Sequence, residues 1–329
     1  MTEFKALLVS EDATGAFKRE VVGRNVEQLP QGELLIRVRY SSLNYKDALS
    51  ASGNRGVTKA YPHTPGIDAA GVVEASGVAE FAVGDEVIVT GYDLGMNTAG
   101  GFGQYIRVPA AWAIKRPQGL PLREAMILGT AGLTAALCVD KLEQAGVVPE
   151  AGTVLVTGAT GGVGSIAVVL LKQLGYRVAA ATGKAEQGDF LRGLGVDEIV
   201  SREELQQGGE RPLLKERWAG AVDTVGGEIL FNVVKSLRHS ASVACCGLTA
   251  GVGFQANVLP FILRGVNLLG VDSVELPLVV KASMWDKLSL QWKLDLAPLC
   301  QEIGLAELPA AIERILSGGM VGRILVRLD

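Results

Sequence analysis

The sequence has few of the side chains that build metal centres and disulfide frameworks. It contains four cysteines and two histidines in 329 residues. No cysteines form a C-x-x-C pair, none falls in the first 137 residues, and His63 and His239 lie far apart. A catalytic zinc takes about three protein ligands, and a structural zinc takes clustered cysteines. We therefore expect no metal site, and buried free thiols at Cys138, Cys245, Cys246 and Cys300.

Basic runs and long apolar runs are also missing. The formal net charge is −4 with basic residues spread among acidic ones, so no general attraction to nucleic acid is expected. The N-terminus lacks the regions of a signal peptide, and no uninterrupted apolar run reaches membrane-spanning length. We expect a cytoplasmic protein whose partners include neither nucleic acid nor a membrane.

What the chain does contain is enough apolar sequence for two packed domains. Hydrophobic residues make up 48% and charged residues 20%, as in ordinary α/β proteins. The first 120 residues hold short β-type segments separated by Gly and Pro, at 4–10, 34–40, 69–76, 86–90 and 104–108. This part predicts a compact β-rich domain.

A glycine-rich stretch at 153–164 (TVLVTGATGGVG) organises the second half of the chain. An apolar run ends in glycines 158, 161 and 164, and a long apolar segment follows, which predicts strand, tight turn and helix. Such a turn offers unpaired amides and a positive helix end to a pyrophosphate. Ala159 stands where the usual G-x-G-x-x-G motif begins, so the motif is also compatible with a purely structural turn.

Strands and helices then alternate to residue 274. The expected strands are 154–156, 177–182, 198–200, 220–225, 242–246 and 267–274, with helices at 123–138, 163–174, 187–193 and 229–237 between or before them. This alternation predicts an α/β fold with a Rossmann, doubly wound parallel sheet. The tail reads as a helix from 307 and a last strand at 323–327, which we expect to return to the β-rich domain.

The residues after the second expected strand favour NADPH over NADH. An NAD site usually places an acidic residue there to hold the ribose 2′-hydroxyl. Here the chain has Thr182, Gly183 and Lys184, and Arg202 follows the next strand. A hydroxyl, a bare backbone and two cations suit a 2′-phosphate. The alternative is that Lys184 and Arg202 are ordinary solvated charges.

Together, these stretches resemble a medium-chain dehydrogenase/reductase of the zinc-free, quinone-oxidoreductase-like type. The matching motifs run in the family's order: 41–47 (SSLNYKD), 65–71 (PGIDAAG), 83–87 (VGDEV), 129–135 (GTAGLTA), 156–164 (VTGATGGVG) and 223–226 (DTVG). More narrowly, 44–47, 260–264 and 270–273 are similar to the acrylyl-CoA reductase branch.

The resemblance implies a GroES-like β-rich catalytic domain into which a Rossmann domain is inserted. The expected ranges are 1–125 for the first part of the catalytic domain, 126–293 for the NADP-binding domain, and 294–329 for the C-terminal return. It further implies NADPH as cofactor, bound between the domains, and a homodimer. Zinc-dependent relatives carry Gly-His-Glu where this chain has Gly66, Ile67 and Asp68. A metal-free reaction is therefore expected.

The resemblance also supplies candidate site residues. The catalytic candidates are Tyr45, Asp47, Asp68 and Arg323. Tyr45 would donate a hydrogen bond to an enolate or a water, or would simply pack; the two aspartates would orient Tyr45 and the ribose, or would cap a helix or pair with Arg323 as scaffolding. The cofactor-binding candidates are Tyr45, Thr160, Gly161, Gly162, Val163, Thr182, Gly183, Lys184, Arg202, Leu248, Ile262, Ser273 and Arg323, with core packing as the alternative for Leu248 and Ile262.

The expected function is NADPH-dependent reduction of the carbon-carbon double bond of a 2-enoyl-CoA, with acrylyl-CoA converted to propanoyl-CoA as the leading hypothesis. Hydride would come from the nicotinamide, while the protein would stabilise negative charge on the carbonyl oxygen and supply a proton. An NADPH:quinone oxidoreductase is the second hypothesis. The third, from another class, is a non-catalytic nucleotide-binding protein that has kept the fold.

Overall fold

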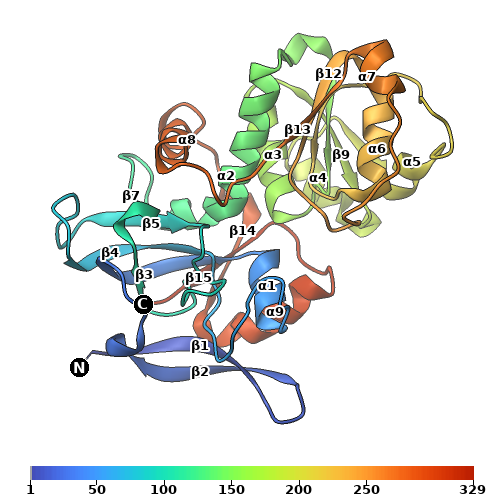
Figure 1. Ribbon diagram of the computed structural model, residues 1–329. Coiled ribbons are helices and arrows are strands. Elements are labelled where there is room, and N and C mark those ends of the chain that lie inside the picture. Colours follow the sequence, from blue (N-terminus) through green and yellow to red (C-terminus); the bar gives the residue numbers. More distant parts are fainter. Residues whose placement is uncertain (1) are drawn as a thin grey trace. The chain divides into compact units, whose positions relative to one another are not determined.

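A computed structural model describes residues 2–329 and divides the chain into two compact units. We call them the β-rich unit (Met1–Thr130, Val274–Gln291 and Leu299–Asp329) and the parallel-sheet unit (Ala131–Ser273 and Trp292–Pro298). Figure 1 shows the elements of each unit along the chain. The α/β architecture with an inserted parallel sheet confirms the fold expected from the sequence.

The β-rich unit contains a two-stranded and a seven-stranded sheet. Alternation builds the core of the larger one: Leu34, Ile36 and Val38 are buried while Arg37 between them is exposed. That sheet has the order β14-β15-β3-β4-β5-β7, and β6 also pairs with β3. The strands are β1 (Glu3–Glu11), β2 (Phe17–Asn25), β3 (Leu34–Leu43), β4 (Asp68–Ser76), β5 (Glu86–Thr90), β6 (Tyr105–Val108), β7 (Ala113–Lys115), β14 (Cys300–Gly304) and β15 (Arg323–Arg327).

Three helices belong wholly to this unit: α1 (Tyr45–Ala51), α8 (Leu278–Leu290) and α9 (Leu308–Leu316). Helices α1 and α9 pack on each other, as Figure 1 shows. Buried Lys281 joins α8 to the sheet, because its ammonium donates to the carbonyls of Thr90 at 2.8 Å and Val274 at 2.7 Å. The helix therefore belongs to the β-rich unit.

The parallel-sheet unit is built on six parallel strands in the order β10-β9-β8-β11-β12-β13. Numbered along the chain this is 3-2-1-4-5-6, the Rossmann order, with its switch point between β8 and β11. Strands β9 and β11 are almost entirely buried, as expected where helices cover both faces. The strands are β8 (Thr153–Thr157), β9 (Arg177–Thr182), β10 (Glu198–Ser201), β11 (Trp218–Asp223), β12 (Leu237–Cys245) and β13 (Asn267–Gly270).

Helices connect these strands. They are α3 (Gly162–Gln173), α4 (Gly188–Gly193), α5 (Arg202–Gln206), α6 (Gly227–Ser236) and α7 (Leu259–Arg264). A sixth, α2 (Leu122–Gln144), begins in the β-rich unit and is interrupted at Gly129, whose φ of 52° and ψ of −154° are not helical. Helix α2 is long and apolar enough to cross a membrane, but 83% of its most apolar window is buried in the protein, as in a core helix.

The structure differs from the sequence-based expectations in a few places. Strand β13 stops at Gly270, four residues before the expected end, because the chain leaves the sheet after Val271 donates to Cys245. The chain passes from one unit to the other at 130/131, 273/274, 291/292 and 298/299, where the sequence suggested 125/126 and 293/294. Helix α8 accounts for most of this shift through the contacts of Lys281. Strands β2, β7 and β14 and helices α1, α5, α7 and α8 were not expected.

Candidate functional site

The glycine-rich turn lies between β8 and α3, at the carboxyl edge of the parallel sheet. Gly158 has φ of +60°, which a side chain would disfavour. At Gly164, a Cβ would lie 2.3 Å from the carbonyl oxygen of Gly158, so only glycine lets the first turn of α3 pack on the loop. The first amides of α3 have no carbonyl partner within the helix and, with the helix dipole, form a site for an anion.

Polar and basic side chains gather at the ends of β9 and β10. The hydroxyls of Thr160 and Thr182 lie 3.3 Å apart, and Thr182 Oγ1 accepts a hydrogen bond from the amide of Lys184 at 3.0 Å. The pKa of Lys184 is lowered, first by burial and then by the guanidinium of Arg202, while Glu186 opposes the shift. Two cations therefore lie close together where an NAD site would hold a carboxylate.

Asp223 is a polar residue of this edge that the sequence reasoning used only as part of a family motif. It ends β11, next to the switch point, and its carboxylate accepts from Thr157 Oγ1 and the amide of Gly226, both at 2.7 Å. Thr224 in turn donates to the carbonyl of Thr157 at 2.8 Å. Burial raises the pKa of Asp223. These hydrogen bonds connect β8 to β11 beside the glycine turn. In the sequence, the position of Asp223 near the end of an expected strand was the signal that could have identified it.

The remaining cofactor candidates of this unit take different positions. Gly161, Gly162 and Val163 are half-buried at the start of α3. Leu248, 55% exposed, follows the carboxyl end of β12, and Ile262, 69% exposed, lies on α7, so core packing is wrong for both. Ser273 does not end the last strand, because β13 stops at Gly270; it is buried and accepts a hydrogen bond from Thr134 at 2.7 Å.

Three cysteines also lie together in this unit. The Cys138 thiol is buried and hydrogen-bonded to that of Cys246, whose Sγ donates to the carbonyl of Asp223 at 3.4 Å. The hydrogen bond with Cys246, followed by burial, raises the pKa of Cys138, and burial raises that of Cys245 to about 11. All four cysteines are free, as expected, but only Cys138 is fully buried.

In the β-rich unit, the candidate acidic residues form a buried cluster around Asn44. The carboxylate of Asp47 accepts from the backbone amides of Asn44 and Ile67, both at 2.8 Å, and so closes the first turn of α1. The side-chain amide of Asn44 donates to Asp47 at 3.2 Å and to Asp68 at 2.8 Å. Burial, followed by the neighbouring charge of Asp68, raises the pKa of Asp47 to about 7.

Asp68 accepts several further hydrogen bonds. Its Oδ2 accepts hydrogen bonds from Ser42 Oγ at 2.6 Å and from the amide of Thr130 at 2.9 Å. Its Oδ1 accepts one from Thr130 Oγ1 at 2.6 Å. The interruption of α2 at Gly129 brings the chain close to the carboxylate of Asp68. A Cβ on Gly129 would lie only 2.4 Å from Asp68 Oδ2. The sequence reasoning missed Asn44, Thr130 and Gly129 as partners of this carboxylate.

Arg323, the first residue of β15, is buried beside the same cluster. Its Nε donates to the carbonyl of Ile127 at 2.8 Å and its Nη1 to Asn44 Oδ1 at 3.2 Å, while buried Nη2 has no hydrogen-bond partner in the described chain. Burial lowers the pKa of Arg323, against the charges of Asp68 and Asp47. These contacts favour the scaffolding role for the two aspartates and Arg323.

Tyr45 differs from these buried groups. It is the first residue of α1 and is 41% exposed, directly after Asn44 and two residues before Asp47. The cluster thus fixes the backbone that carries the phenol without enclosing the ring. His63 is buried and bonded to the carbonyl of Gly95 at 2.9 Å, as an incidental histidine would be. Within residues 2–329, no three His, Cys, Asp or Glu side chains are grouped to hold a metal ion.

Comparison with known proteins gives two family models and several full-length relatives. The "alcohol dehydrogenase GroES-like domain" matches residues 30–118, and the "zinc-binding dehydrogenase" domain matches 162–289. YhfP of Bacillus subtilis, named as a quinone oxidoreductase, is 46% identical over 99% of both chains. Acrylyl-CoA reductase AcuI of Ruegeria pomeroyi is 44% identical, also over 99% of both.

Solved structures agree with this. The yhdH oxidoreductase of Salmonella enterica, crystallised with NADP, is 43% identical with a TM-score of 0.96, over 99% of this chain and all of the other. The structure of Bacillus YhfP, with NAD bound, also has a TM-score of 0.96 and covers both chains completely. With two relatives above 40% identity along the whole chain, this protein belongs to the medium-chain dehydrogenase/reductase family of oxidoreductases, in its quinone-oxidoreductase-like, acrylyl-CoA reductase branch.

Proposed function

We propose that the protein uses NADPH to reduce the carbon-carbon double bond of a 2-enoyl-CoA, with acrylyl-CoA converted to propanoyl-CoA. The observation that carries the cofactor assignment is the pair of cations, Lys184 and Arg202, at adjacent strand ends, with Arg202 lying against Gly183. The substrate assignment is supported by the identity to acrylyl-CoA reductase AcuI along the whole chain.

In the parallel-sheet unit, the groups described above would divide the dinucleotide between them. The amides at the start of α3 would bind the pyrophosphate. Lys184 and Arg202 would bind the 2′-phosphate, and Thr182 would orient the backbone that carries Lys184. Exposed Leu248 and Ile262 would contribute apolar contacts. The bound cofactor supplies the hydride.

In the β-rich unit, Tyr45 would act on the substrate. The reduction develops negative charge on the thioester oxygen, and a phenol that donates a hydrogen bond there, directly or through water, stabilises the enolate. Asp47 and Asn44 hold the first turn of α1, so Tyr45 is presented on a fixed backbone. Asp68 and Arg323 would support this turn through Asn44.

A quinone is the competing substrate, and NADH the competing cofactor. YhfP is named for quinone oxidoreductase activity, and its crystal structure holds NAD. A simple quinone needs a flat apolar pocket and no contact with a CoA nucleotide. The two substrates therefore make different demands on the same hydride donor.

A panel of initial rates tests this function. The purified chain is given NADPH or NADH with acrylyl-CoA, crotonyl-CoA or a benzoquinone, and nicotinamide oxidation is followed. We expect the largest kcat/KM with NADPH and acrylyl-CoA. Faster turnover of the quinone would contradict the substrate assignment, and an equal rate with NADH would contradict the cofactor assignment.

A homodimer and a cytoplasmic location complete the proposal. Val258, Phe261 and Leu263 are exposed apolar residues on and before α7, and β13, which follows α7, is the last strand of its sheet. Unpaired strand edges are common places of association. Light scattering after gel filtration should give twice the chain's 34.5 kDa mass; a single-chain mass would contradict the dimer.

A further inference from the structure

The guanidinium of Arg202 lies over the bare Cα of Gly183. A Cβ on Gly183 would lie 2.8 Å from Arg202 Cζ and 2.9 Å from its Nε. The φ of Gly183 is outside the left-handed region, so alanine fits the backbone at this position. The three atoms nearest to such a methyl group all belong to the side chain of Arg202. The guanidinium occupies space that a side chain at position 183 would need.

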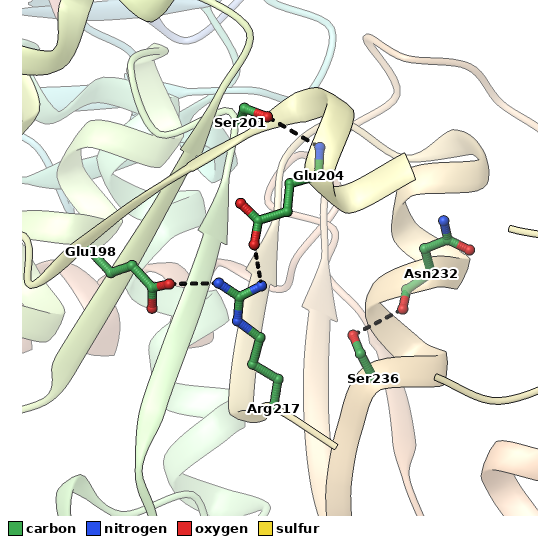
Figure 2. Close-up of polar contacts among 6 residues, drawn as sticks. All are labelled: Glu198, Ser201, Glu204, Arg217, Asn232 and Ser236. Carbon is green, nitrogen blue, oxygen red and sulfur yellow. Dashed lines mark hydrogen bonds and ion pairs between the residues drawn. The ribbon is translucent and has the colours of Figure 1, made fainter. Parts of the chain in front are cut away.

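Arg217 engages two carboxylates that flank Arg202 in the sequence. Figure 2 shows it between Glu198 of β10 and Glu204 of α5, with Nη2 donating to Glu198 at 2.5 Å and Nη1 to Glu204 at 2.6 Å. The guanidinium of Arg217 also stacks on Trp218, 4.1 Å from the ring centre. Both carboxylates are thereby held on one cation.

The third flanking carboxylate is also occupied locally. Glu203 interacts with its own backbone amide and with the Ser201 hydroxyl, which lower its pKa before the smaller effect of Arg202. Ser201 also caps α5 by accepting from the amide of Glu204 at 3.1 Å (Figure 2). Arg202, the first residue of that helix, is exposed. Arg202 is therefore not the main partner of any of these three carboxylates.

We propose that Gly183 and Arg217 are positioning residues that set the preference for NADPH over NADH through Arg202. Gly183 leaves the space that seats the Arg202 guanidinium, and Arg217 holds Glu198 and Glu204 so that they do not compete with a phosphate for it. This inference rests on the proposed function, because the 2′-phosphate is the group that Arg202 would bind. Neither residue needs to touch the cofactor.

Gly183→Ala tests the seat. Dissociation constants are measured by titrating the full chain with NADPH and with NADH, followed by nicotinamide fluorescence and without any second substrate. A displaced Arg202 loses a charge-assisted contact, so the NADPH constant should rise about 10-fold while the NADH constant stays within about 2-fold. Gly193→Ala is the matched control, since a Cβ there meets nothing within 4 Å, and it should change neither constant. Unchanged NADPH binding in Gly183→Ala would overturn the seat.

Arg217→Gln tests the holding of the carboxylates. Because these groups are partly exposed, we expect a rise of only about 3-fold in the NADPH dissociation constant and no change for NADH. Adding Glu198→Gln and Glu204→Gln to Arg217→Gln should restore NADPH binding, since no carboxylate is then released. A loss that persists in the triple variant would show that Arg217 acts only on the fold, and would overturn its proposed role.

The wild-type titration separates this inference from the function on which it rests. If the wild-type chain binds both dinucleotides equally, the NADPH assignment fails and the inference fails with it. If the wild-type chain prefers NADPH but both variants keep that preference, only the inference fails. Failure to reduce acrylyl-CoA leaves these binding constants unaffected, so the substrate assignment is judged independently.

Discussion

Tyr45 and Asp47 occupy one turn of α1 but have opposite surroundings. Tyr45 is partly exposed, whereas Asp47 is buried and bonded to two backbone amides. A phenol at the protein surface can meet a substrate, and a buried carboxylate that closes a helix turn cannot do so without breaking that turn. The two residues therefore have different expected phenotypes.

Replacing Tyr45 by phenylalanine removes the hydroxyl and keeps the ring. If the hydroxyl stabilises the enolate, kcat for the enoyl-CoA should fall at least about 10-fold with little change in NADPH affinity. Tyr105→Phe serves as the control. Tyr105 lies on β6 and its ring packs against Phe4, so this substitution should leave kcat unchanged. Unchanged turnover in Tyr45→Phe would leave Tyr45 a packing residue.

Asp47 should make the stability of the protein depend on pH. Its pKa of about 7 in the folded chain exceeds its ordinary value of 3.8, so the folded state binds the proton more tightly than the unfolded state. The free energy of unfolding should therefore fall as pH rises from about 4 to about 7, by up to a few kcal/mol, and level off above that.

Asp47→Asn should remove this dependence. The asparagine amide keeps an acceptor for one backbone N–H but loses the second, so the free energy of unfolding at pH 5 should fall by about 1 kcal/mol. Between pH 5 and pH 8, the free energy of unfolding should fall less in the variant than in the wild type. Urea unfolding at pH 5, 6, 7 and 8 measures both slopes. The same slope in variant and wild type would show that Asp47 does not titrate in this range.

At the scale of elements, the interruption of α2 connects the helix to the polar cluster. Gly129 combines φ of 52° with ψ of −154°, which places the amide and hydroxyl of Thr130 on the carboxylate of Asp68. In a regular helix that amide would donate to the backbone carbonyl four residues earlier. The conformation of Gly129 thus makes the Thr130 amide available to hydrogen-bond Asp68 in the candidate site.

Gly129→Ala should be more damaging than an ordinary glycine substitution. The methyl group would meet Asp68 Oδ2 at 2.4 Å and Ser42 Oγ at 2.5 Å in addition to the strained backbone, for a loss of about 3 to 5 kcal/mol. Gly175→Ala, with φ of +84° and open space, isolates the backbone part and should cost about 1 to 2 kcal/mol. Equal losses in urea unfolding would contradict the contact with Asp68.

At the scale of the whole molecule, we expect the reaction to need no metal. Asp68 stands near the position where zinc-dependent relatives carry ligands, and its two oxygens already accept bonds from Ser42, Asn44 and Thr130. Dialysis against EDTA should leave the rate with NADPH and acrylyl-CoA unchanged, and added zinc should not increase it. A loss of activity that zinc restores would contradict this prediction.

Much of the fold could be predicted because its signals are local. Strands β5, β9 and β15 were placed at their observed bounds, and the six parallel strands followed from alternating apolar segments. Short or weakly apolar elements such as α1 and α5 carried no periodic signal and were missed. Strand β13 was overextended, because an apolar run does not show where pairing with β12 stops.

The sequence by itself determined the glycine turn, the cations that follow two neighbouring strands and the types of residue in the candidate site. Each depends on residues close together in the chain, whose spacing fixes what the backbone can form. Only the tertiary structure decided that Asn44, Asp68, Thr130 and Arg323 meet in one hydrogen-bonded cluster, and that Arg202 rests on Gly183. These partners lie up to 279 residues apart, so their contacts depend on how the strands pair and not on any local pattern.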